Sequence, residues 1–115
     1  MSADARARRR AVIVARIKPG SAERVAAIFG ASDATELPRR AGVVHRSLFV
    51  LGDVYVHLVE SEGDLEAAVA AVRDHPEFVA ISTLLAEHIE PLDPETWRSP
   101  RDAFAREFYR WDSGD

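Results

Sequence analysis

The chain has 115 residues, a formal net charge of −4 and no cysteine. This length fits one domain, and the lack of cysteine excludes a disulfide framework, a thiolate metal site and a cysteine nucleophile. No apolar run approaches the ~20 residues of a membrane span, and the N-terminus lacks the apolar core of a signal peptide. We therefore expect a cytoplasmic protein that does not bind a membrane.

The arginines are concentrated at the N-terminus, where residues 1–10 hold four of the fourteen. We expect these ten residues to form a disordered basic leader, followed by a single domain over 11–111 and a flexible tail at 112–115. Residues 11–115 contain 11 basic and 18 acidic residues. Such an acidic body repels a phosphate backbone, so no nucleic-acid partner is expected.

The first elements follow from local patterns. Residues 11–18 are apolar and β-branched and end at Pro19-Gly20, which predicts a strand. Ser21 is a natural N-cap, and the apolar stripe after it predicts a helix that stops near Gly30. Residues 32–38 (SDATELP) then predict a polar loop that holds Asp33.

Residues 43–60 predict a β-hairpin with Gly52-Asp53 as its turn. A two-residue loop pairs Leu51 with Val54 and Leu48 with His57, and opposed residues share a face of the sheet. One face then presents Val44, Arg46, Leu48, Val50, Tyr55, His57 and Val59. The other presents His45, Ser47, Phe49, Leu51, Val54, Val56, Leu58 and Glu60.

The first of these faces combines a guanidinium (Arg46), an imidazole (His57) and a phenol (Tyr55) with apolar side chains. Arg46 and His57 are diagonal neighbours, so the arrangement indicates a lined pocket. The alternative is that Arg46 and Tyr55 lie at a solvated rim and that His57 is a core histidine. Arg16 fits either the pocket or a solvated strand end, and Asp33 either orients the cluster or is an ordinary turn residue.

The second half of the chain predicts two helical pieces, a short strand and an aromatic tail. An apolar stripe from Leu65 to Val72 is interrupted at Asp74-His75-Pro76, and a second stripe runs from Phe78 to Leu85. His75 at this break is expected to cap the second helix or to be exposed. Residues 88–92 predict a short strand, and the aromatic tail at 103–111 is expected to add an extra strand.

The order strand, helix, hairpin, helix pair, strand is the β-α-β-β-α-β pattern of a ferredoxin-like α+β domain. We expect the helices to cover the hairpin face with Phe49, Val54, Val56 and Leu58. The opposite face is also too apolar for water, so a second copy is expected to cover it. A homodimer of this kind forms an α/β barrel that encloses Arg46, Tyr55 and His57.

The chain contains no glycine-rich phosphate loop, HExxH or GxSxG motif, and its four histidines lack metal-ligand spacing. Neither a metal nor an organic cofactor is therefore expected. What remains is acid–base chemistry in an enclosed pocket, or binding alone.

Several segments resemble the aromatic polyketide cyclase family of type II polyketide pathways. They are SDATELP (32–38), GVVHRSLF (42–49), DVYVHLVE (53–60), DHPEF (74–78) and FYRW (108–111). The resemblance implies a dimeric ferredoxin-like protein that closes a ring of a polyketide by intramolecular aldol condensation and dehydration, without metal or cofactor. Its product would belong to an antibiotic or a spore pigment, and other polyketide synthase components are candidate partners.

The resemblance also implies residue roles. Asp33, Arg46 and His57 are the expected catalytic residues, with His57 as the base, Arg46 as the partner of the developing enolate and Asp33 as the group that orients them or relays a proton. The family has a histidine where this chain has Ser32. The expected substrate contacts are Tyr55, Arg16, Ser32, Leu48 and Val14.

Two other functions fit the same features. One is a cofactor-free monooxygenase of the same fold that oxidises an aromatic polyketide. The other is a non-catalytic module that binds or chaperones the polyketide.

Overall fold

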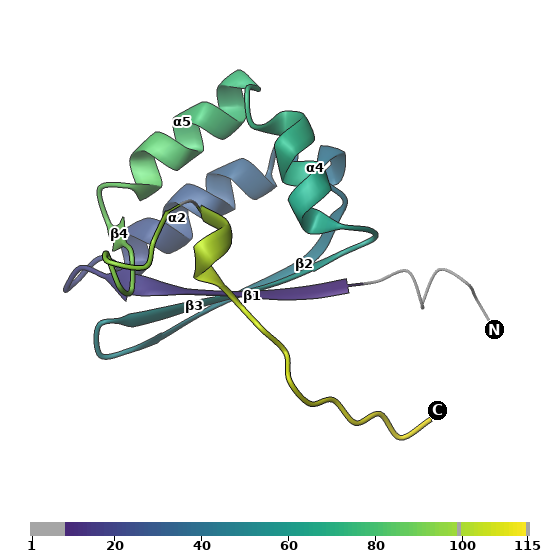
Figure 1. Cartoon of the computed structure of the whole chain (residues 1–115). Coiled ribbons are helices and arrows are strands. Elements are labelled where there is room, and N and C mark those ends of the chain that lie inside the picture. The colour runs from purple at the N-terminus through teal and green to yellow at the C-terminus, as the bar shows by residue number, and fades with distance from the viewer. Residues whose placement is uncertain (1–8, 99, 115) are drawn as a thin grey trace.

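The computed structural model describes residues 9–98 and 100–114. A layer of helices covers one face of an antiparallel sheet (Figure 1). The elements are β1 (Arg9–Ile17), α2 (Ala22–Asp33), α3 (Leu37–Arg40), β2 (Val43–Leu51), β3 (Val54–Ser61), α4 (Leu65–Val72), α5 (Pro76–Leu85), β4 (Ile89–Glu90), the 3-10 helix η1 (Pro100–Ala103) and β5 (Phe104–Ala105).

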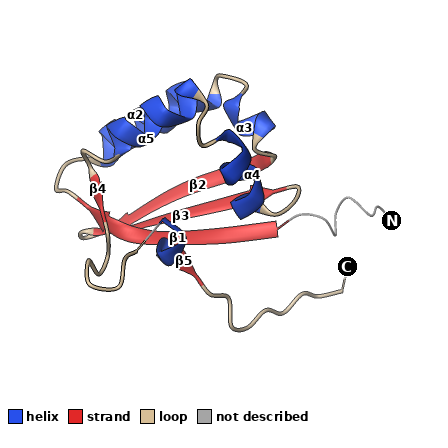
Figure 2. Ribbon diagram, turned by 45° about the horizontal axis from the view of Figure 1, so that its top comes forward, coloured by secondary structure: helices blue, strands red, loops and turns tan. Residues whose placement is uncertain are grey.

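The strand order is β2-β3-β1-β4, and β5 pairs with β1 beside β4. The strands β2, β3 and β1 lie side by side below the helices (Figure 2). This topology confirms the predicted ferredoxin-like α+β fold. None of the helices in the described ranges has the length and apolar character that crossing a membrane requires.

The predicted hairpin register is confirmed from the turn outward. Leu51 pairs with Val54 and Leu48 with His57, and Gly52 takes a φ of +61° that favours glycine in this turn. Further along, a register shift between Val43 and His45 interrupts the alternation of side chains. Because of this bulge, Val43 lines the cavity described below and Val44 does not.

The prediction of which sheet face the helices cover was wrong. The helices cover the face with Tyr55, His57 and Val59, which are 5%, 7% and 2% exposed. The reason lies in β1, whose register aligns Ile13 with His57 and Ala15 with Tyr55. The wholly apolar side of β1 therefore joins the hairpin face that carries the polar groups, and helices rather than a second copy enclose those groups.

The boundaries of α2 also differ from the prediction. The helix continues through Gly30, which has no positive φ, and ends at Asp33. Asp33 therefore lies on the last turn of a helix and not in a loop. At the break between α4 and α5, His75 is the N-cap of α5, and its Nδ1 accepts a hydrogen bond from the Glu77 amide at 3.2 Å.

The two ends of the chain differ from their predictions as well. Arg9 and Arg10 belong to β1, and the rest of the expected leader, residues 1–8, lies outside the described residues. The tail forms a strand only at β5, and residues 106–114 have no regular structure. Beyond β5 the tail extends away from the sheet, on the side that the helices leave open (Figure 1).

The core lies between the helices and the sheet. Val25, Phe29 and Ile81 of the helices pack against Ala15, Ile17 and Tyr55 of the strands. Each large apolar side chain buried there contributes about 1.5–3 kcal/mol to stability. The core holds the helices at the distance from the sheet that leaves room for a cavity.

Candidate active site

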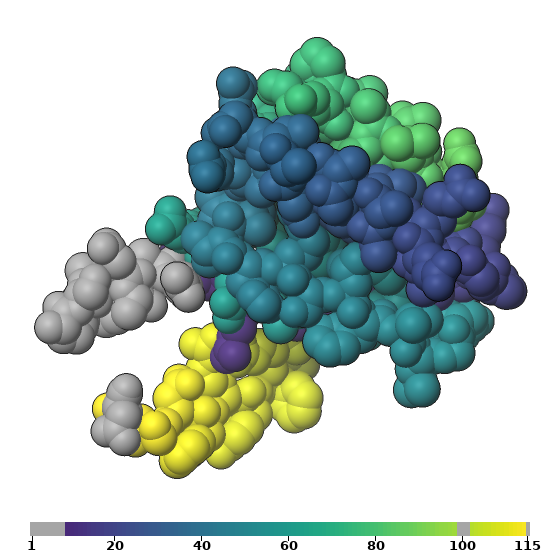
Figure 3. Space-filling model, turned by 180° about the vertical axis from the view of Figure 1, so that it is seen from behind, coloured from purple at the N-terminus to yellow at the C-terminus, as the bar shows by residue number. Residues whose placement is uncertain are grey.

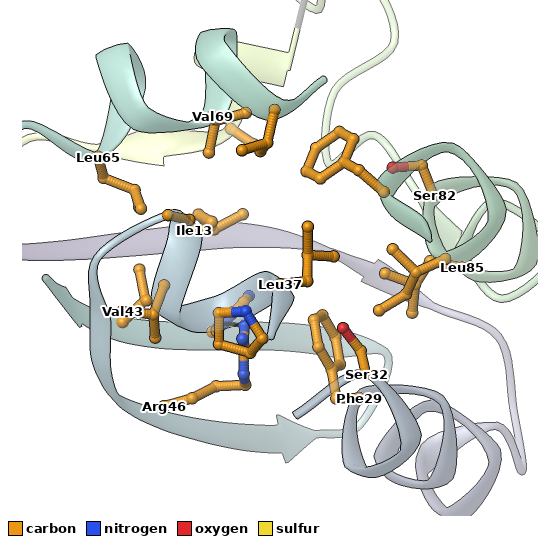
Figure 4. A pocket seen from close by; sticks show the side chains of 18 of the residues that line it. Ile13, Phe29, Ser32, Leu37, Val43, Arg46, Leu65, Val69, Ser82 and Leu85 are labelled. Carbon is orange, nitrogen blue, oxygen red and sulfur yellow. Dashed lines mark hydrogen bonds between the residues drawn. The ribbon is translucent and has the colours of Figure 1, made fainter. Parts of the chain in front are cut away.

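A cavity of about 310 Å³ lies between the sheet and the helices. Arg46 faces it from the sheet, and Leu65 and Val69 close it from the other side (Figure 4). Most of its walls are apolar. The lining side chains are Ile13, Phe29, Ser32, Leu37, Pro38, Ala41, Val43, Arg46, His57, Val59, Leu65, Val69, Val72, Phe78, Ile81, Ser82, Leu85, Trp97, Ala103 and Phe104.

Arg46 is the only permanent charge in this wall, and Asp33 holds it with both carboxylate oxygens. Nε of Arg46 donates to Oδ2 at 3.1 Å, and Nη2 donates to Oδ1 at 2.9 Å. A carboxylate at the C-terminal end of a helix is disfavoured by the helix dipole. The position of Asp33 at the end of α2 is therefore best explained by its pairing with the largely buried Arg46 side chain.

Phe29 contacts the side chains of Arg46 and His57. The Cζ atom of Arg46 lies 4.7 Å from the centroid of the Phe29 ring, and the His57 ring lies 5.0 Å from it in an edge-on arrangement. Sequence reasoning assigned Phe29 only to the apolar stripe of a helix. Its spacing of four residues from Asp33 was the available signal, but a helix that ended at Gly30 concealed it.

His57 completes the cluster through its Nε2 atom. Nη1 of Arg46 lies 3.1 Å from Nε2, and a guanidinium can only donate, so Nε2 accepts this bond. Burial, reinforced by the charge of Arg46, lowers the pKa of His57 from 6.5 to about 4. The imidazole is therefore neutral at physiological pH.

The residues predicted to contact substrate separate into three places. Ser32 lines the cavity. Tyr55 and Leu48 lie under α2 and line a second cavity of about 270 Å³, and burial raises the pKa of Tyr55 although Arg46 opposes the rise. Arg16 and Val14 lie on the opposite sheet face, where Arg16 pairs with Asp53 at 2.7 Å, so neither lines a cavity with His57.

The described residues contain no group of three or more histidine, aspartate or glutamate side chains that could hold a metal ion. The polar side chains that line the cavity include Arg46, His57, Ser32 and Ser82, and Asp33 binds Arg46 from outside the lining. This arrangement can bind and polarise carbonyl oxygens by hydrogen bonds within apolar walls.

Comparisons with known proteins agree with this arrangement. The family model described as "Polyketide synthesis cyclase" matches residues 9–112. The chain is 50% identical over 102 residues to the polyketide synthase CurG of Streptomyces cyaneus, covering 89% of this chain and 95% of that protein. It is 37% identical over 106 residues to the tetracenomycin F2 cyclase of Streptomyces glaucescens, covering 92% and 96%.

The solved structure of the tetracenomycin F2 cyclase superposes with a TM-score of 0.85 at 36% identity, covering 91% of this chain and 98% of that one. The family model extends over every element that lines the cavity, and the two relatives match 89% and 92% of the chain. The chain therefore belongs to the aromatic polyketide cyclase family.

Proposed function

We propose that this polyketide cyclase closes a ring of an aromatic polyketide intermediate by intramolecular aldol condensation and dehydration, without a metal or an organic cofactor. One observation supports this proposal above the others. A charged guanidinium, fixed by a carboxylate and bonded to a neutral imidazole, faces an apolar cavity of about 310 Å³.

The chemistry of ring closure fits these groups. A methylene between two carbonyls loses a proton, and its carbon forms a bond with a second carbonyl carbon in the same chain. The oxygen of that second carbonyl takes up a proton and becomes a hydroxyl. The former methylene carbon then loses its second proton, and the hydroxyl takes up another proton and leaves as water, so that a carbon–carbon double bond forms. Negative charge develops on oxygen in the first step, and Arg46 supplies a fixed positive partner for it.

The apolar walls serve the positioning of the substrate. A polyketide chain is flexible, and most of its conformers do not bring the reacting carbons together. A cavity lined by Leu37, Phe78, Trp97 and similar side chains selects a folded conformer of an aromatic ligand. Holding the reacting groups in one geometry can supply a large part of the rate.

The role of base that the sequence assigned to His57 is not part of this proposal. Its Nε2 atom already accepts a hydrogen bond from Arg46, so that lone pair is not available while the cluster is intact. The orienting role predicted for Asp33 is supported by its two bonds to Arg46.

The proposal also includes a homodimer, although not the one expected from the sequence. The sheet face away from the helices carries Val12, Val14 and Val56, and its side chains Phe49 and Leu51 are 55% and 84% exposed. In the tail, Phe108, Tyr109 and Trp111 are also exposed, and this segment stands off the body on the same side (Figure 3). A two-fold arrangement places each tail against the partner's sheet and covers both apolar sets.

The test is turnover under argon. Purified protein is incubated with linear and partly cyclised aromatic polyketides, and products are identified by liquid chromatography with mass spectrometry. The proposal predicts a product that has lost one water, formed at the same rate with and without oxygen. Oxygen-dependent gain of an oxygen atom would establish a monooxygenase, and tight binding without accelerated cyclisation would establish a binding module.

A further inference from the structure

The state of the His57 ring follows from its hydrogen bond to Arg46. A guanidinium carries five N–H donors and no acceptor, so the Nε2 atom that faces Nη1 at 3.1 Å must be unprotonated. In a neutral imidazole the proton then lies on Nδ1. The cluster thus fixes which of the two ring nitrogens carries the hydrogen.

The bond to Nε2 is held in place from two sides. Asp33 accepts from Nε and Nη2 of Arg46, which sets the plane of the guanidinium and directs Nη1 at His57. Phe29 packs against both the guanidinium of Arg46 and the imidazole of His57, so neither group can rotate freely. Moving the proton from Nδ1 to Nε2 would leave two donors facing each other, Nε2–H and the N–H of Nη1.

Nδ1 itself has no hydrogen-bond partner within residues 9–98 and 100–114. No fully buried side-chain nitrogen or oxygen in the described part of the chain lacks a partner, so Nδ1 is not fully buried. The residue His57 is 7% exposed, and it lines the cavity. Its one free N–H is therefore offered to the space where a ligand would lie.

The geometry points to His57 as a hydrogen-bond donor that binds a substrate carbonyl oxygen through Nδ1–H, beside Arg46. This inference rests on the proposed function. It makes Arg46 and His57 the two hydrogen-bond donors to the substrate. The three bonds to Asp33 and His57 use three of the five N–H groups of Arg46, so two remain for the same carbonyl or its neighbour.

No proton passes to or from His57 in this scheme. The methylene carbon loses one proton to a water molecule and forms the new carbon–carbon bond, and the carbonyl oxygen takes a proton from water to become a hydroxyl. The same carbon then loses its second proton to water, the hydroxyl takes up another proton from water and leaves as water, and a carbon–carbon double bond forms. The two donors stabilise the negative charge on oxygen between these steps. A neutral imidazole suits this role because it donates without being consumed by the reaction.

Three variants separate a donor from a base. His57→Asn places an amide N–H at the position of Nδ1, His57→Gln places an amide at the position of Nε2, and His57→Ala has neither. We expect His57→Asn to keep at least a tenth of the wild-type kcat/KM and the other two to lose about 100-fold, which is the cost of removing one oxyanion donor. Equal losses in all three, with wild-type melting temperatures, would overturn the donor role while the wild-type rate still upholds the cyclase.

Nitrogen-15 NMR of the labelled wild-type protein tests the same inference without turnover. We expect Nδ1 of His57 to be protonated and Nε2 unprotonated at neutral pH, and the Nδ1–H resonance to shift when dihydroxyanthraquinone, an aromatic ketone, is added. A proton on Nε2, or an unchanged Nδ1–H resonance with the ketone bound, would refute it. If the wild type cyclises no substrate, the proposed function fails and this measurement still decides the donor.

Discussion

Arg46 is the side chain that Asp33, Phe29 and His57 all contact. It is a permanent charge in an apolar wall, and such a charge is costly unless it is paired and hydrogen-bonded. Asp33 supplies the opposite charge, Phe29 the aromatic face and His57 the remaining acceptor. The three contacts hold the guanidinium at the cavity, where the proposed function requires it to meet a substrate oxygen.

Replacing the carboxylate tests this dependence. Asp33→Asn keeps the shape of the side chain but removes its charge and one of the two acceptors for Arg46. We expect kcat/KM for cyclisation to fall about 100-fold, because a guanidinium displaced by about 1 Å no longer meets the developing charge. The melting temperature should also fall, because the Arg46 side chain, which is only 15% exposed, loses its paired charge.

Glu36→Gln is the matched control for Asp33→Asn. Glu36 lies three residues further along and pairs with Arg39 at 3.5 Å, where both side chains are exposed. We expect wild-type activity from it. Similar losses in the two variants would mean that activity depends on the negative charge of this region and not on the bond between Asp33 and Arg46.

The neutral state of His57 predicts a pH dependence of stability. Its folded pKa is about 4 and its unfolded value 6.5, so the unfolded chain binds more protons between these values. The free energy of unfolding should therefore rise from pH 4 to pH 6.5 and level off above. The contribution of His57 is roughly 3 kcal/mol.

Urea unfolding of the wild type and His57→Gln at several pH values measures this contribution, because the variant lacks the titration but keeps the other groups. The difference in unfolding free energy between the two proteins should move in favour of the wild type as the pH rises through this window. A difference that stays constant with pH would show that His57 has the same pKa in the folded and the unfolded protein.

The helix α2 brings Phe29 and Asp33 to Arg46, so the proposed site depends on the length of this helix. Gly30 lies inside it with a helical backbone, and a Cβ atom at this position would meet nothing within 4 Å. Gly30→Ala should raise the free energy of unfolding by about 1 kcal/mol in urea titrations.

Gly52→Ala is the opposite control for Gly30→Ala. Gly52 has a φ of +61°, which an alanine adopts only with strain, so this variant should lose about 1 kcal/mol. Destabilisation by Gly30→Ala would contradict a continuous α2 and with it the placement of Asp33.

Local patterns predicted much of this arrangement. Alternation along the hairpin and the two-residue turn placed Arg46 and His57 on one face, and the structure confirms it. The covering of that face could not be predicted, because it depends on the register of β1 against β3, which pairs residues about 45 positions apart. The bond between Arg46 and Nε2 of His57 depends on side-chain rotamers, which no spacing in the sequence encodes.

At the scale of the whole molecule, the helices cover one sheet face and leave the other uncovered, and the proposed homodimer would cover it. Val56→Lys puts a charge in the middle of the uncovered face. We expect the wild type to have twice the chain mass in light scattering after gel filtration and Val56→Lys to have the mass of one chain, since burying an unpaired ammonium is costly.

Ala67→Lys, on an exposed position of α4, is the control for the charge itself and should stay dimeric. The dimer would be refuted by a wild type with the mass of a single chain. If Val56→Lys remained dimeric, the dimer interface would not lie on this face of the sheet.

The central claim is that Arg46 stabilises the negative charge that forms during ring closure, and Arg46→Lys tests it most directly. Lysine keeps the positive charge but cannot form the paired bonds to Asp33 or direct a second donor at the substrate. The measurement is the single-turnover rate of conversion to the dehydrated ring product. The account predicts a loss of about 100-fold with an unchanged fold, and a wild-type rate from Arg46→Lys would contradict it.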